Sequence, residues 1–139
     1  MKEGTVILLL LLSTQLVRAQ DHFQSGELKG FTKSAAESIV IHLEQPFIVK
    51  EVSGTVLRSV GDESPLNDAL FELRGPGNSV TIKSAKTNAD GSFQISGVSP
   101  GRYLFKSTAL GFQSIVGKVI VSPKAGPTHT ITLRMRPGV

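Results

Sequence analysis

Apolar and polar residues alternate along most of the chain after Phe47, which is the spacing of a β-strand with one buried face. Turn-forming residues interrupt the alternation at short intervals, and no segment between them has the period of an amphipathic helix. This pattern predicts an all-β domain, an antiparallel sandwich or small barrel. We count seven predicted strands, at 52–57, 69–74, 82–87, 92–96, 102–106, 114–122 and 128–135.

Glycine and proline mark the predicted turns between these strands. The Asp90-Gly91 pair between two strand patterns is typical of a β-hairpin, because glycine adopts the positive φ of a tight turn without steric cost. At Pro100-Gly101 the proline ring presets the negative φ of a turn, and glycine follows it. We predict fold-defining turns at Gly54, Pro65, Gly91, Pro100, Gly101 and Gly111.

The first nineteen residues have the pattern of a secretory signal peptide. Val6–Leu12 is apolar throughout, a run that suits the centre of a signal peptide and falls short of the roughly 20 residues of a bilayer span. Val17-Arg18-Ala19 fits a cleavage site, so the mature chain is expected to start at Gln20. The alternative is a buried N-terminal strand or helix. With no second apolar stretch of spanning length, we expect a periplasmic or extracellular protein without a transmembrane segment after cleavage.

Residues 20–46 form an N-terminal arm in this interpretation, ahead of a domain at 47–136. Residues 21–37 are polar and lack a clear period, so we predict a linker or loose arm there. The β-branched segment Ser38–Glu44 favours an extra strand. Ala35-Ala36-Glu37 immediately before it leaves a helix as the alternative.

The absence of cysteine excludes disulfides, thiolate metal sites and a cysteine nucleophile. An exported small domain of eukaryotic origin usually carries disulfides, so a bacterial source is expected. Nor does any asparagine lie in an N-glycosylation sequon.

The order of the turn and core residues resembles the carboxypeptidase regulatory-like domain. The series runs Gly54-x-Val56, Pro65-Leu66-x-x-Ala69-x-x-x-Leu73, Thr87-x-x-x-Gly91-x-Phe93, Gly97-Val98-x-Pro100-Gly101-x-Tyr103 and Gly111-Phe112. The resemblance implies a seven-stranded antiparallel prealbumin-like (Ig-like) β-sandwich. That fold is also grouped with carbohydrate-binding sandwiches, which implies polysaccharide as the ligand class.

The residues provide no catalytic set. Gly97-Val98-Ser99-Pro100-Gly101 reads as a nucleophile elbow, but the residue after the serine lacks the N–H that an oxyanion hole needs, and no helix pattern follows. His22, His42 and His129 are scattered, so no zinc site is expected. We therefore predict neither enzymatic activity nor a cofactor nor a metal.

Charge is uneven along the chain. Residues 20–72 hold four basic and nine acidic side chains, a net of −5, whereas residues 73–139 hold nine basic and one acidic, a net of +8. The basic half suits an acidic polysaccharide or anionic lipid. Export argues against nucleic acid. The alternative is charge pairing between neighbouring strands of the sandwich.

Aromatic side chains stack against sugar rings in many carbohydrate sites, and this chain has no tryptophan. We predict ligand contacts at Phe47, Tyr103 and Phe112, with Phe47 and Phe112 as an exposed pair. The function we expect is a secreted, non-catalytic module that binds polysaccharide at the bacterial cell envelope. The alternative is a structural or protein-interaction module that contacts an envelope protein. The sequence leaves the oligomeric state open.

Overall fold

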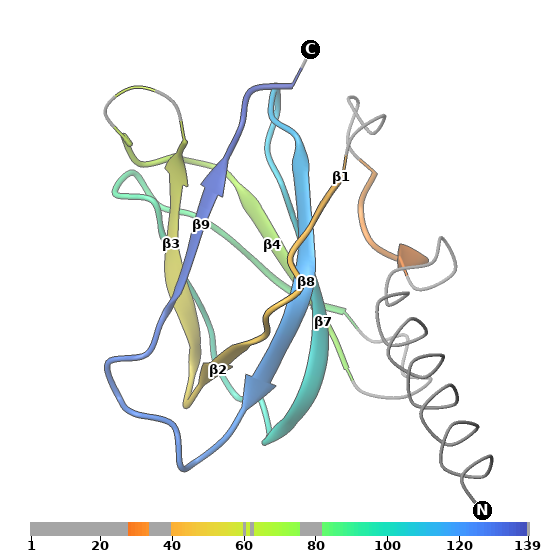
Figure 1. Ribbon diagram of the computed structural model, residues 1–139, viewed down its shortest axis with the longest axis vertical. Helices are drawn as coiled ribbons and strands as arrows, with labels where there is room; N and C mark the ends of the chain where they lie inside the picture. The colour runs from red at the N-terminus through yellow and green to blue at the C-terminus, as the bar shows by residue number, and fades with distance from the viewer. Residues whose placement is uncertain (1–27, 34–39, 60, 62, 76–81, 139) are drawn as a thin grey trace, which may run out of the picture.

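The computed structural model describes residues 28–33, 40–59, 61, 63–75 and 82–138, and these contain two β-sheets packed face to face (Figure 1). The predicted signal peptide and residues 34–39, on which the helical alternative for 35–37 rests, lie outside the described residues. The strands are β1 (Val40–His42), β2 (Phe47–Val49), β3 (Val52–Arg58), β4 (Leu70–Arg74), β5 (Ile82–Lys86), β6 (Ser92–Ile95), β7 (Gly101–Thr108), β8 (Ser114–Val121) and β9 (Ile131–Met135).

The larger sheet has six strands, five of them in the order β1-β8-β7-β4-β5. The sixth strand, β2, pairs with β8 further along β8 than the residues that pair with β1. Here β1 and β2 run parallel to β8, whereas β7 is antiparallel to both β8 and β4. The smaller sheet has three strands in the order β6-β3-β9, with β3 parallel to β9. The prediction of an all-β sandwich is confirmed.

Two details of the prediction are wrong. The described part of the chain holds nine strands, and the sandwich mixes parallel with antiparallel pairs. Phe47–Val49 forms a separate strand. Three residues are too few to show the alternation from which a strand is predicted. Strand direction depends on which segments pair, and that choice is made by tertiary packing.

The predicted inward faces meet in one core between the sheets. A row of rings crosses it: Phe93 stacks on Phe71 at 4.4 Å between centroids, Phe71 on Phe105 at 5.0 Å, and Phe105 meets Phe47 at 6.0 Å. Aliphatic side chains from both sheets surround this row.

The turn predicted at Gly54 is not present, because Gly54 lies inside β3. A Cβ built on Gly54 would sit 1.9 Å from the carbonyl oxygen of Ile131, its partner in β9. Glycine is required there because two backbones approach too closely for a side chain. Gly91 has a φ of 77° and Gly111 a φ of 84°, backbone values that suit the turns predicted there. Pro65 lies in the connection between β3 and β4, where it bridges to Leu57, while Pro100 forms a bend just before β7 begins at Gly101.

The Asp90-Gly91 turn forms, but the hairpin predicted around it does not. Gly91 N–H donates to the Asn88 carbonyl at 2.9 Å, as in a tight turn. The strands on either side belong to different sheets, since β5 pairs with β4 and β6 pairs with β3. The turn therefore carries the chain across the core from one sheet to the other.

The arm was predicted to be loose, and its described part is not. Phe31 is only 6% exposed, and Thr32 bonds the side chain of Glu72 on β4. Residues 28–33 thus cover part of the outer face of the larger sheet. The extra strand expected within Ser38–Glu44 is present as β1.

Candidate functional site

A groove of about 630 Å³ lies on the outer face of the larger sheet, over β7 and β8. Its floor and walls come from strand residues that alternate with the core positions, and from the connection between β1 and β2. The lining consists of Glu44, Pro46, Gly75, Arg102, Tyr103, Leu104, Lys118 and Ile120.

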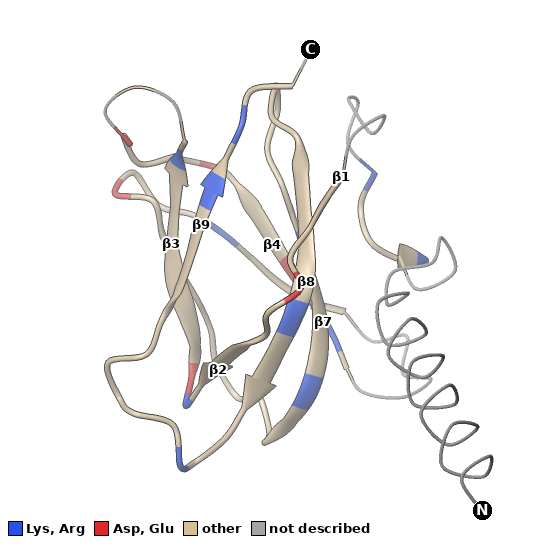
Figure 2. Ribbon diagram, viewed as in Figure 1, with Lys and Arg blue, Asp and Glu red and all other residues tan. Residues whose placement is uncertain are grey.

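Strand register determines the arrangement of the groove floor. Arg102 of β7 is paired with Ile120 of β8, and Leu104 is paired with Lys118. Two cationic and two aliphatic side chains therefore occupy alternate corners of a four-residue square. Blue segments mark the cationic positions on β7 and β8 in Figure 2. Ile48 of β2 pairs with Ile120 and is 50% exposed, so the apolar surface extends beyond the groove.

The connection between β1 and β2 adds the wall of the groove. Glu44 and Pro46 lie there, between two short strands that both pair with β8. The groove thus combines cationic donors, one carboxylate acceptor and an aliphatic floor. That combination suits a ligand with apolar faces, hydroxyl groups and negative charge.

The arm occupies the neighbouring part of the same face. Arg74 of β4 is paired with Leu104 of the groove floor, and its guanidinium donates to the Lys29 carbonyl at 2.7 Å. The same guanidinium lies over the Phe31 ring, 5.2 Å from its centroid. The arm therefore holds Arg74 at the boundary of the groove.

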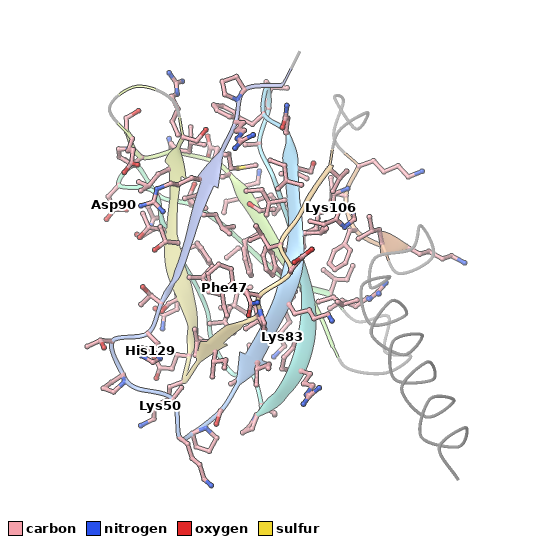
Figure 3. All side chains as sticks on the ribbon, viewed as in Figure 1. Phe47, Lys50, Lys83, Asp90, Lys106 and His129 are labelled. Atoms are coloured by element: carbon pink, nitrogen blue, oxygen red, sulfur yellow. The ribbon has the colours of Figure 1, made fainter. Side chains whose placement is uncertain are left out.

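The three aromatic residues predicted to bind ligand do not form one surface. Phe47 and Tyr103 both pair with Val119 from opposite sides, which places them on the inner face, where Phe47 contacts Phe105 (Figure 3). Tyr103 also reaches the edge of the groove, and its hydroxyl donates to the Ser99 carbonyl. Both are half-buried and pack against the core.

Phe112 lies at the other end of the sandwich, in the connection between β7 and β8. It bridges to Pro137, and the Arg58 guanidinium lies 5.7 Å from its ring centroid. From the start of β8 to Val119 is roughly 17 Å at strand spacing. Phe47 and Phe112 are therefore separated and half-buried, and these two residues do not form an exposed pair.

The other sequence motifs with catalytic resemblance do not build a site. Ser99 is exposed and is followed by strand β7, so the strand-to-helix geometry of a nucleophile elbow is absent there. Within the described ranges, no group of three or more potential ligands could hold a metal ion. A smaller cavity of about 180 Å³ beside Tyr103 is lined in part by Lys83, whose ammonium donates to the Gly97 carbonyl at 3.0 Å.

The outer surface of the smaller sheet is polar and largely uncharged. A shallow depression of about 290 Å³ there is bordered by hydroxyl and amide side chains. Thr55 is paired with both Ser92 and Thr132 across this surface. At its end, Arg134 pairs with Glu63 at 3.2 Å, both about half exposed, so at least one charge pair joins the acidic and basic halves of the chain.

Among the described residues, Asp90 is the titratable group whose pKa is clearly shifted. The hydroxyl of Ser92 donates to its carboxylate at 2.7 Å and the Ser92 N–H donates at 3.1 Å. These two bonds hold the pKa of Asp90 below its ordinary value near 3.8. Asp90 lies in the inter-sheet turn and Ser92 begins β6, so the shift reflects the structure of the turn.

Sequence reasoning missed the groove residues Glu44, Arg102, Leu104, Lys118 and Ile120. Alternation in the predicted strand 102–106 puts Arg102, Leu104 and Lys106 on the face opposite Tyr103 and Phe105, a signal that identifies a face without identifying a site. Which outer residues of β8 stand beside them depends on register across two strands, and no local pattern specifies that register.

Comparisons with solved structures give distant similarity. Hydroxyquinol 1,2-dioxygenase from Pseudomonas putida DLL-E4 aligns with a TM-score of 0.44 and 10% identity, over 85% of this chain and 64% of that chain. Chlorocatechol 1,2-dioxygenase from Pseudomonas putida aligns with a TM-score of 0.42 and 10% identity, over 77% of this chain and 68% of that chain. Similarity this weak carries no inference about chemistry. No curated protein matches the sequence.

The family comparison is more informative. The model of the carboxypeptidase regulatory-like domain matches residues 51–134, from the residue before β3 to the fourth residue of β9. The match contains the β3, Gly91 and β7 segments described above, and it covers more than half of the sequence. The chain therefore belongs to the carboxypeptidase regulatory-like domain family.

Proposed function

We propose that the protein is a secreted, non-catalytic accessory module that binds polysaccharide at the bacterial cell envelope. Membership of a regulatory-like family supports a role without catalysis. The signal-peptide pattern of residues 1–19 supports export. In described residues, no helix is long and apolar enough to cross a bilayer.

The observation that carries the proposal is the groove over β7 and β8. Leu104 and Ile120 offer an aliphatic floor for the C–H face of a sugar ring, and Arg102 and Lys118 offer donors to its oxygens. An open groove accepts an internal segment of a long chain, which a closed pocket cannot.

Calorimetric titration against neutral and acidic polysaccharides tests this function. Leu104→Ala removes part of the floor and is expected to weaken binding severalfold. Thr55→Ala, on the solvent face of the smaller sheet, is the matched control and leaves binding unchanged. The absence of heat with every polysaccharide would overturn the proposal.

One observation favours the second candidate, a protein-interaction module. Leu110 is 95% exposed at the turn between β7 and β8. Backbone bonds make this turn firm, with Phe112 N–H donating to the Ala109 carbonyl at 3.0 Å and Gly138 N–H to the Gly111 carbonyl at 2.7 Å. A partner retained from an envelope extract by the wild type and by Leu104→Ala, but lost by Leu110→Ser, would favour this role.

A further inference from the structure

We infer that the groove selects an acidic polysaccharide and that Arg102 and Lys118 bind its carboxylates. The inference rests on the proposed function and adds to it the ligand class and the residues that recognise it. It depends on the positions of the two cations, the carboxylate beside them and the apolar surface between them.

The two cations stand at diagonal positions of the β7–β8 pair. Arg102 is opposite Ile120, and Lys118 lies two residues from Ile120 along β8. Diagonal neighbours in an antiparallel pair are about 7–8 Å apart. Long side chains at that separation reach two negative groups carried by neighbouring sugar residues. The guanidinium of Arg102 also matches the two oxygens of a carboxylate in a bidentate pair.

The apolar floor distinguishes a sugar acid from a simple anion. Leu104 and Ile120 occupy the other diagonal of the same square, and Ile48 extends this surface past Ile120. A pyranose presents C–H groups on its faces and polar groups at its rim. The rings can therefore cover the aliphatic side chains while their carboxylates reach the cations at the corners.

Glu44 argues for a ligand that also carries hydroxyl groups. Its exposed carboxylate lines the groove that Arg102 and Lys118 line. A carboxylate accepts hydrogen bonds from sugar hydroxyls and repels anionic groups, so the carboxylates of the ligand would lie at Arg102 and Lys118 and its hydroxyls at Glu44. The groove therefore fits a polyhydroxylated acid better than it fits a nucleic acid or a phospholipid surface.

The described residues 28–33 of the arm cover a neighbouring part of the same sheet. Phe31 and Thr32 cover the region around Glu72, and Arg74 is bound to Lys29 at the boundary. Recognition in the groove accordingly rests on Arg102 and Lys118, while Arg74 supports the arm. The excess of basic residues in the second half of the chain adds a favourable field for an anionic polymer.

The test compares one polymer with and without its charge. Polygalacturonate and its fully methyl-esterified form share a backbone and differ in the carboxylates. The wild-type protein is expected to bind the acid form, with an affinity that falls as salt is raised, and to bind the ester at least about tenfold more weakly. Arg102→Gln and Lys118→Gln are each expected to weaken binding of the acid form about tenfold.

Arg134→Gln is the matched control, since Arg134 is an exposed arginine of the smaller sheet. It is expected to bind polygalacturonate like the wild type. Thermal unfolding of each variant shows whether the sandwich is intact. Loss of binding in Arg102→Gln with an unchanged melting temperature supports the inference.

The opposing outcomes separate this inference from the proposed function. Equal binding of the acid and its ester overturns the selectivity for charge and leaves polysaccharide binding standing. Equal binding of poly-glutamate or of single-stranded DNA at matched charge overturns the sugar class. Acid binding that survives Arg102→Gln and Lys118→Gln overturns the site. No binding to either polymer or to other glycans overturns both proposals.

Discussion

The carboxylate of Glu72 accepts hydrogen bonds from the N–H and the hydroxyl of Thr32, at 2.9 and 3.1 Å, although forty positions separate the two residues. Glu72 is only 6% exposed, on the outer face of β4. Lys106 of β7 is its paired neighbour and is also buried. A charged group in that position needs partners, and the arm supplies two donors. The arm is thereby part of the folded domain.

Thr32→Val is expected to weaken docking of the arm by about 1–2 kcal/mol, because one acceptor of a buried carboxylate loses its donor. Hydrogen exchange of residues 28–33 measures the effect, and these amides should exchange faster while those of β8 do not. Thr132→Val on the exposed face of β9 is the control and should change neither. Unaltered exchange in Thr32→Val would contradict the role given to this contact.

Gly54→Ala is expected to destabilise the protein by about 3 kcal/mol or more, because the added Cβ would meet the Ile131 carbonyl and push β9 away from β3. Denaturant unfolding measures the change. Gly111→Ala is the comparison, since nothing lies within 4 Å of its Cβ and only the positive φ opposes the substitution, at about 1 kcal/mol. Equal losses in the two variants would argue against the close approach of the strands.

Ser92→Ala is expected to raise the pKa of Asp90 toward its ordinary value, because the hydroxyl of Ser92 is the main group that lowers it. Titration of the Asp90 carboxyl by NMR measures the shift, with Ser53→Ala as the control. The lowered pKa means that the stabilisation by this carboxylate is present above about pH 3.8 and is lost as the pH falls through the folded value. The stability difference between wild type and Ser92→Ala should therefore shrink in that acidic range. A difference that stays constant into strong acid would contradict this account.

Phe112→Ala is expected to lower stability by about 2 kcal/mol without weakening polysaccharide binding, since the ring packs against the core and the Arg58 guanidinium. Thermal unfolding and calorimetric titration measure the two effects. Loss of binding at unchanged stability would instead restore Phe112 as a ligand contact.

The recognition of the family needed no tertiary information. Its ordered turn and core residues are local features, since each glycine or proline reflects a backbone geometry within a few residues. Gly54 and Gly91 are exceptions, because a Cβ on Gly54 would lie 1.9 Å from the Ile131 carbonyl oxygen and one on Gly91 would lie 2.7 Å from the Val56 carbonyl oxygen. A glycine required by close approach and one required by a turn look alike in a sequence.

The candidate site could be predicted only in part. Alternation puts Arg102 and Leu104 on the face opposite Tyr103 and Phe105, but the aromatic residues predicted to contact a sugar are half-buried and separated. Aromatic side chains are favoured in cores as well as in binding sites, so composition alone does not assign them.

By itself, the sequence determined that this chain forms a sandwich of short strands, because a period of two and a fixed order of turns are local properties of the backbone. Only the tertiary structure decided that β1 and β2 lie parallel to β8, that β3 lies parallel to β9, and that Asp90-Gly91 links two sheets. It also brought Lys118 beside Leu104 and Thr32 onto Glu72. The physical reason is register: pairing between distant strands is selected by the packing of the whole core, and that selection determines which outer side chains become neighbours.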